Sequence, residues 1–221
     1  MSDGFADILW ARVDGPARSW LERAWPAVDE GLTSVRFRAA FAGIGRRLRE
    51  YQLGDEDIQN LADAGVVGAR GWGIDAIART ALLLRALEIL SSDRHRGFVR
   101  QVYLRGDYRE QAAVLRSLPF LPEPERFLDL AVEACRTNVL DVFEGIACEN
   151  TYPAAYFPEA NFNQLVLKAI FMEVAVSRVA GLDGRVTVEL QRMATDFADE
   201  RRAASRAVPG DVDLIVNLAA S

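Results

Sequence analysis

Apolar side chains recur along most of the chain at spacings of three and four residues, the period of a helix that packs one face against a core. The clearest case runs from Ile74 to Leu90, after the glycine-rich stretch GARGWG, with Ile77, Leu84 and Leu87 available for burial. Alternation with a period of two never persists, and no Asn-Gly or Asp-Gly hairpin separates alternating apolar runs. The pattern therefore predicts helices and no substantial sheet.

The remaining helices are expected between clusters of helix-breaking residues. They are predicted from about Pro16 to Trp25, from Ser34 to Leu48, from Asp55 to near Gly65, and at 94–104, 107–117, 123–136, 138–148, 158–174, 185–207 and 211–219. Breaks are predicted at Pro119–Pro122, at Tyr152–Pro158 and at Gly181–Gly184.

Many helices joined by short loops pack as helix pairs on helix pairs. We expect an all-α fold, either an irregular α-α superhelix of HEAT-like helix pairs or a compact helical bundle. Residues 1–221 are expected to form a single all-helical domain, with residues 1–70 as an N-terminal helical subdomain.

The composition is that of an ordinary globular protein, since half of the 221 residues are hydrophobic and 26% are charged. The net charge of −6 argues against nucleic acid as a partner, because phosphate neutralisation needs a concentrated basic surface. The N-terminal residues do not resemble a signal peptide, and no stretch approaches about 18 uncharged apolar residues. We expect a cytoplasmic protein without a membrane span.

Cys135 and Cys148 are interpreted as reduced core residues, and with one histidine they are too few for a metal site.

The polar segment from Arg136 to Lys168 differs from the rest of the chain, because amide side chains gather there near aromatic residues. Its amides are Asn138, Asn150, Asn161, Asn163 and Gln164. Each amide taken alone also fits a cap or a turn. On a helix, Arg136 and Glu144 lie two turns apart on one face with apolar neighbours. Such charges form a salt bridge to another helix, or they serve a ligand, with Glu144 as acid, base or hydroxyl acceptor and Arg136 as an anion clamp.

Lys168, the one lysine of the chain, is a second candidate. Gln164 and Asn161 precede it by four and seven residues, so the three side chains share one stripe of an apolar helix. One interpretation is a lysine whose ammonium reaches solvent along its apolar stem. The other is a pocket in which Lys168 and the amides hold a phosphate or carboxylate. Tyr152-Pro153 and Tyr156-Phe157-Pro158 are expected to form a rigid aromatic loop into this helix, either lining a ligand site or only connecting.

The common catalytic motifs are missing from the sequence. There is no glycine-rich phosphate loop, nucleophile elbow, HExxH zinc pair or aspartate-rich DDxxD stretch. His95 lies among charged residues near a predicted helix start, which is typical of a surface residue and not of a general base. Binding is therefore favoured over catalysis.

The order of motifs in the second half of the chain resembles EboA-domain proteins, encoded in the ebo gene clusters of cyanobacteria and other bacteria. The family pattern runs LPxLPxPE, RTN…VFEAIA…NPYP, WNQMVLKALF and a Leu-Asp turn before a final long helix. The matching segments are LPFLPEPE (118–125), RTNVLDVFEGIACENTYP (136–153), NQLVLKAIF (163–171) and GLDGR (181–185). The resemblance covers residues 116–206 and departs from the pattern at Phe162, where the family has tryptophan, and at Thr151, where its loop reads Asn-Pro-Tyr-Pro.

The resemblance implies an accessory protein in the biosynthesis or export of a secondary metabolite, of the kind associated with scytonemin precursors. Carried over residue by residue, its motifs mark Arg136, Asn138, Glu144, Tyr152, Pro153, Asn163, Gln164 and Lys168. The aromatic loop adds Tyr156 as a ligand-binding candidate. The expected partners are a small intermediate or proteins of the same gene cluster, including a membrane prenyltransferase, and no cofactor is expected.

Two alternatives remain open at this stage. The helical surface could act as a protein–protein adaptor without a ligand. The chain could also be a metal-independent isomerase or lyase for a cyclitol or sugar-like compound, with Glu144 as general base and Lys168 as electrophile. That role would need a carboxylate with a raised pKa.

Overall fold

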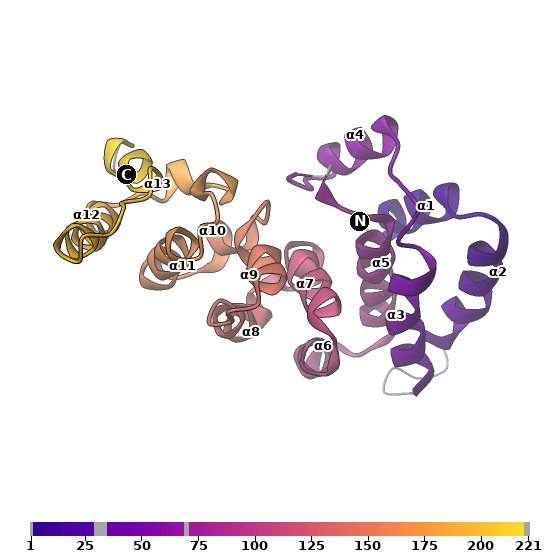
Figure 1. Ribbon diagram of the computed structural model, residues 1–221. Coiled ribbons are helices and arrows are strands. Elements are labelled where there is room, and N and C mark those ends of the chain that lie inside the picture. The colour runs from indigo at the N-terminus through magenta and orange to yellow at the C-terminus, as the bar shows by residue number, and fades with distance from the viewer. Residues whose placement is uncertain (1, 29–34, 69–70, 219–221) are drawn as a thin grey trace. The chain divides into compact units, whose positions relative to one another are not determined.

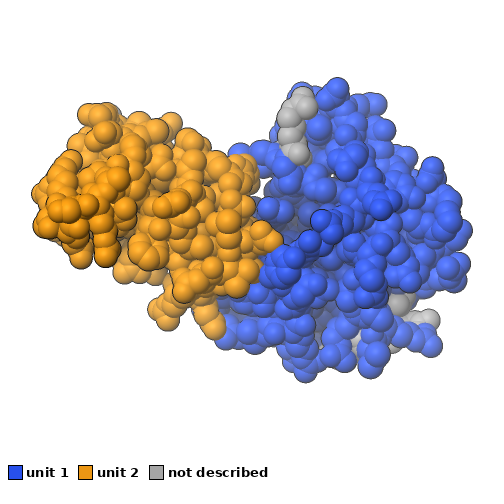
Figure 2. All heavy atoms as spheres, in the orientation of Figure 1, with its two compact units in different colours: residues 1–130 blue, residues 131–221 orange. Residues whose placement is uncertain are grey.

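The computed structural model describes residues 2–28, 35–68 and 71–218, and every regular element in these ranges is a helix (Figure 1). The predicted all-α fold class is confirmed. The chain divides into two compact units, residues 1–130 and 131–221 (Figure 2). The single domain over residues 1–221 and its N-terminal helical subdomain, residues 1–70, stay predictions. Within the described ranges, no helix combines the length and the apolar character needed to cross a lipid bilayer.

The first unit is built around α5 (Ile74–Ile89), in which Ile77 and Leu83 are fully buried. Helix α5 contacts α1 (Ser2–Arg12), α3 (Val35–Arg47), α6 (Ser92–Arg105), α7 (Tyr108–Ser117) and the 3₁₀ helix η1 (Trp25–Val28). The unit also contains α2 (Gly15–Ala24), α4 (Asp55–Asp63), η3 (Leu118–Phe120) and η4 (Pro124–Phe127). The pattern predicts most of these helices but not α1, and Ser34, the first residue of one predicted helix, lies outside the described residues.

His95 is buried in this unit, with 5% of its surface exposed, so the prediction of a surface residue is wrong. Its Nε2 lies 2.8 Å from the carbonyl oxygen of Leu87 and 3.0 Å from that of Leu90. Both partners are acceptors, so the proton is on Nε2, which donates to them. The imidazole thus satisfies carbonyls that the end of α5 leaves without helical partners, which is a structural role.

The second unit is built around α11 (Glu159–Phe171), which contacts α9 (Leu140–Ala147), α12 (Val188–Ala203) and η5 (Val176–Arg178). Phe143, Phe162 and Leu165 are fully buried there. The other elements are α10 (Tyr152–Tyr156), η6 (Leu182–Gly184) and α13 (Asp211–Asn217), which packs on α12. Helix α8 (Leu128–Ala134) crosses the boundary between the two units.

A short non-helical connection separates α8 from α9. The Thr137 hydroxyl accepts a hydrogen bond from the backbone N–H of Val139 at 3.1 Å, a local alternative to helical bonding. Arg136 lies beyond α8, which ends at Ala134, and before α9, so the prediction that it shares a helix face with Glu144 is wrong. Helix α8 also begins later than predicted, because the chain first forms the 3₁₀ helix η4 after Glu123, whose φ of +51° is in the left-handed region.

The predicted aromatic loop at 152–158 is wrong for its first five residues, which form the short helix α10. Pro153 suits a first helical turn, where its missing N–H has no helical partner. The Asn150 side chain fixes the start, because its Oδ1 accepts from the N–H of Tyr152 and its Nδ2 donates to the carbonyl of Gly145, both at 2.9 Å. Phe157 and Pro158 then connect α10 to α11.

Candidate functional site

A pocket of about 300 Å³ lies in the second unit, at the end of α8 and along one face of α11. Helix α11 contributes Asn161, Gln164, Leu165 and Lys168, α8 contributes Val132, and the turn that follows α8 contributes Cys135 and Arg136. Phe157, from the connection between α10 and α11, completes the lining. The stripe of Asn161, Gln164 and Lys168 therefore lies in a pocket, which we call the α8–α11 pocket. Its volume is at the lower end of the range for small-molecule sites, roughly 300–1,000 Å³.

Two cations, Arg136 and Lys168, line the α8–α11 pocket, and no lining residue is acidic. Arg136 is exposed and Lys168 is half-buried. Within residues 2–28, 35–68 and 71–218, neither side chain forms an ion pair or a hydrogen bond. The Lys168 ammonium lies 5.7 Å from the centre of the Phe143 ring, a cation–π distance. The pocket is locally positive in a chain of net charge −6.

Lys168 and Cys135 influence each other within the pocket. Loss of hydration lowers the pKa of Lys168, and the neighbouring Cys135 opposes this change. Burial raises the pKa of the Cys135 thiol to about 12, against the opposing charge of Lys168. The thiol donates to the carbonyl of Ala131 at 3.3 Å. Near neutral pH it is therefore protonated, and a protonated thiol is neither a strong nucleophile nor a metal ligand.

Glu144 belongs to a separate ionic cluster around Arg178 and does not line the α8–α11 pocket. Arg178 Nη1 donates to Glu144 at 2.6 Å, while Nε and Nη2 donate to the two oxygens of Glu149 at 2.8 and 3.0 Å. The hydrogen bonds to Glu149, and then to Glu144, raise the pKa of Arg178. Of the two residues predicted for catalysis, Lys168 therefore lines the α8–α11 pocket and Glu144 does not. Elsewhere in the described chain, no group of three His, Cys, Asp or Glu side chains is placed to hold a metal.

The other predicted binding residues also lie outside the pocket lining. Asn138 is exposed in the connection between α8 and α9. Tyr152 is fully buried, with its ring centre 4.8 Å from that of Tyr156. Asn163 is 1% exposed and two residues from Asn161, so it lies on another face of α11. Its Oδ1 is buried without a hydrogen-bond partner in the described part of the chain.

Sequence reasoning missed Arg185, which fixes the pocket residue Phe157. The Arg185 guanidinium donates to the carbonyl of Phe157 at 2.7 Å and to the carbonyl of Ala154, so it holds the end of α10. It also stacks 4.6 Å from the centre of the buried Phe162 ring. The segment GLDGR contained the signal, since Arg185 is its cation and Gly181 approaches Ala154 closely. Cys135 and Val132 were likewise not predicted as pocket residues, and Phe157 was predicted only as part of the aromatic loop before α11.

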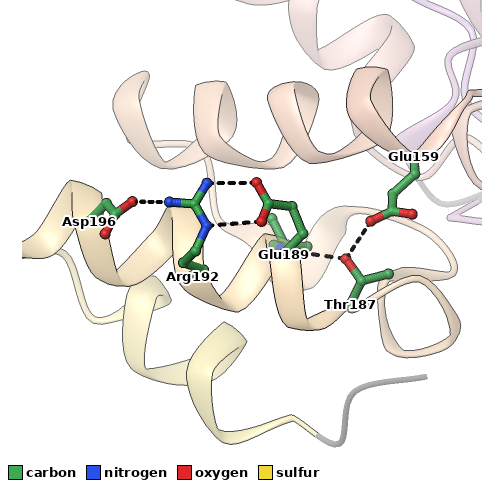
Figure 3. Close-up of polar contacts among 6 residues, drawn as sticks. Glu159, Thr187, Glu189, Arg192 and Asp196 are labelled. Atoms are coloured by element: carbon green, nitrogen blue, oxygen red, sulfur yellow. Dashed lines mark hydrogen bonds and ion pairs between the residues drawn. The ribbon is translucent and has the colours of Figure 1, made fainter.

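The first turn of α11 is tied to the start of α12 by Thr187 (Figure 3). The Thr187 hydroxyl donates to Glu159 at 2.9 Å and accepts from the N–H of Leu190 at 3.2 Å, which caps α12. Further along α12, Arg192 bonds to both Glu189 and Asp196 on the helix surface (Figure 3). These ion pairs join residues of α12 only, so the Thr187 contact with Glu159 is the part that links α11 to α12.

One protein family matches almost the whole chain. Neither a curated protein nor a solved structure matches it. The protein family described as metabolite traffic protein EboA matches residues 1–217 of the 221. This match includes the pocket residues and also the N-terminal residues that precede the motifs of 116–206. The chain therefore belongs to the EboA family.

Proposed function

We propose that the protein binds a small intermediate of metabolite traffic and holds it in the α8–α11 pocket. The observation that carries this proposal is the meeting of Arg136, Asn161, Gln164 and Lys168 in one pocket of about 300 Å³. The family description supports it, because traffic of a metabolite requires a site that holds it. Arg136, Gln164 and Lys168 also fall within the motifs of the resemblance, which gives these motifs a reason beyond packing.

The pocket chemistry favours binding over catalysis. None of the lining residues carries a carboxylate or an imidazole, the usual groups for proton transfer near neutral pH. The Cys135 thiol keeps its proton because burial raises its pKa. Glu144, the expected general base, bonds to Arg178 instead. The isomerase or lyase alternative thus lacks its proposed pair of groups, and the pocket is suited to holding a ligand unchanged.

We further propose that the bound molecule is an intermediate of secondary-metabolite biosynthesis or export. The protein would deliver it to other proteins of the same gene cluster, including a membrane prenyltransferase. The pocket supports such a role because Arg136 and Gln164 are exposed, so a ligand can enter and leave without unfolding the unit.

Native mass spectrometry tests this proposal on protein purified from a host that carries the rest of the gene cluster. Gln164→Trp fills the pocket from an exposed helix position, and Gln101→Trp makes the same change on the exposed surface of α6. We expect a small molecule on the wild type and on Gln101→Trp, and its loss from Gln164→Trp. Bare protein in all three samples would contradict a carrier role.

An adaptor without a ligand is the second candidate, favoured by exposed apolar side chains in the second unit. Phe171, at the end of α11, is 68% exposed, and Val139 and Leu140 are exposed where α9 begins. The same experiment separates the two functions. A partner chain that co-purifies with wild type and with Gln164→Trp, with no small molecule on either, would establish the adaptor.

A further inference from the structure

The charge of the α8–α11 pocket narrows the class of molecule that it can hold. Arg136 and Lys168 line the pocket, Asn161 and Gln164 add amide donors, and the lining contains no acid. A half-buried ammonium such as that of Lys168 is stabilised by a negative partner, and none is supplied to it by the described residues. The lowered pKa of Lys168 has the same physical origin, because burial removes hydration that an anion would replace.

Lys168 lies toward the end of the pocket that Cys135 lines. Lys168 is close enough to Cys135 for each to shift the pKa of the other, and Arg136 follows Cys135 directly in the chain. Asn161, in the first turn of α11, is seven residues before Lys168, a separation of about 10 Å along a helix. Phe157 precedes α11 by two residues, so it belongs to the Asn161 end. The pocket thus has a cationic end and an aromatic end, with the buried Leu165 between them on the same face.

We propose that the ligand is a small organic anion with an apolar, flat body. Its charged oxygens would bind Lys168 and Arg136, and its body would lie along Leu165 toward the Phe157 ring. A polar group at the far end of the body would reach the Asn161 amide. The volume of about 300 Å³ accommodates a body of one or two rings. This inference rests on the proposed function and adds the chemical class of its ligand.

The test uses three probes that share one ring system: 2-naphthoate, its neutral amide 2-naphthamide, and 2-naphthyl phosphate. Binding to the full chain is followed by ligand-observed NMR titration at low and at high salt. We expect at least one of the two anions to bind about tenfold or more tightly than the amide, because a charge-assisted contact is stronger than a neutral one. The two anions distinguish a carboxylate site from a phosphate site. High salt should weaken binding of the anion and leave binding of the amide unchanged.

Single substitutions test whether Lys168 and Arg136 cause the preference for anions. Lys168→Met keeps the length of the stem and removes the charge, and we expect about tenfold weaker anion binding with amide binding unchanged. Arg136→Met, at an exposed position beyond the end of α8, provides a second variant that leaves the helical core intact. Arg206→Met removes an exposed cation outside the pocket and should bind like wild type. Circular dichroism confirms that each variant is folded.

Three outcomes overturn the inference. The first is equal affinity for the anions and the amide, and the second is anion binding that Lys168→Met and Arg136→Met leave unchanged. The third is no binding of either anion at millimolar concentration. Failure of the proposed function looks different, because native mass spectrometry then finds bare wild-type protein. If the wild type instead carries a neutral metabolite that Gln164→Trp loses, the proposed function stands. The inference that the ligand is an anion is then wrong.

Discussion

The guanidinium of Arg185 donates a hydrogen bond to the carbonyl of Phe157 at 2.7 Å, and Phe157 lines the α8–α11 pocket. Its second contact, with the carbonyl of Ala154, holds the preceding turn of α10. A residue just before α12 therefore positions a pocket wall 28 residues earlier in the chain. The segment 181–185 thus has a structural connection to the candidate site.

Arg185→Lys tests this connection. A lysine keeps the charge but cannot bridge two carbonyls as the planar guanidinium does. We expect the free energy of unfolding to fall by about 1–2 kcal/mol in urea titrations followed by circular dichroism. Retention of the metabolite should fall as well, because Phe157 loses its anchor. Arg192→Lys, an exchange at an exposed arginine of α12, should change neither, and equal behaviour of the two variants would refute the positioning role.

Gly181→Ala is expected to destabilise the turn before α12. Gly181 has φ of +75°, and a Cβ there would lie 2.7 Å from the Cβ of Ala154. The left-handed backbone and the clash together should cost about 2 kcal/mol or more. Gly184→Ala is the matched control in the same turn, because a Cβ there meets open space and its φ is not in the left-handed region. Thermal unfolding should show a lower Tm for Gly181→Ala alone, and similar Tm values would contradict the steric argument.

The Cys135 thiol should make stability fall above pH 9. Its ordinary pKa is 9.0, and burial raises the value to about 12 in the folded chain. Below pH 9 the thiol is protonated in both states, so its full contribution to stability is present. Between pH 9 and about pH 12 the Cys135 thiol loses its proton in the unfolded chain and keeps it in the folded chain. Stability is therefore lost as pH rises, by about 1.4 kcal/mol per pH unit well above pH 9.

Cys135→Ala isolates this contribution. Urea unfolding under reducing conditions at several pH values from 8 to 10 should give a steeper decline for wild type than for the variant. Lys168 contributes a pH dependence of stability with the opposite sign. Its pKa is lowered in the folded chain, so stability rises with pH until the pKa of Lys168 in the unfolded chain is reached. That residue is present in both chains, so the difference in slope reports the thiol together with its coupling to Lys168. Parallel curves would show that Cys135 is not buried as described.

Local spacing predicted those features of the site that lie on a single helix. Asn161, Gln164 and Lys168 share a face because their separations of three, four and seven residues are fixed by the helical period. The all-α fold class follows from the same periodicity. Neither result depends on how the helices pack.

Features that depend on tertiary packing were not predictable from the same pattern. Glu144 meets Arg178, 34 residues away, and periodicity does not say which elements meet. The shared face of Arg136 and Glu144 failed because α8 ends at Ala134 and α9 begins only at Leu140, so the two residues do not lie on one helix.

Two short helices were missed for a related reason. Helix α1 places Phe5, Ile8 and Leu9 in the core and contacts α5. Helix α10 has five residues, and its start depends on the side chain of Asn150. Helices this short are marginal alone, so contacts with the rest of the chain decide whether they form.

Glu144→Gln separates the structural interpretation of Glu144 from a role at the ligand. The variant keeps the side-chain shape and an oxygen that can accept from Arg178, while Glu149 retains its own two hydrogen bonds. Because Arg178 is partly exposed, solvent screens the lost charge, and we expect the free energy of unfolding to fall by no more than about 1 kcal/mol. Native mass spectrometry should still find the metabolite on Glu144→Gln, in contrast to Lys168→Met. A folded Glu144→Gln protein that has lost the metabolite would instead place Glu144 at the ligand and revive the general-base hypothesis.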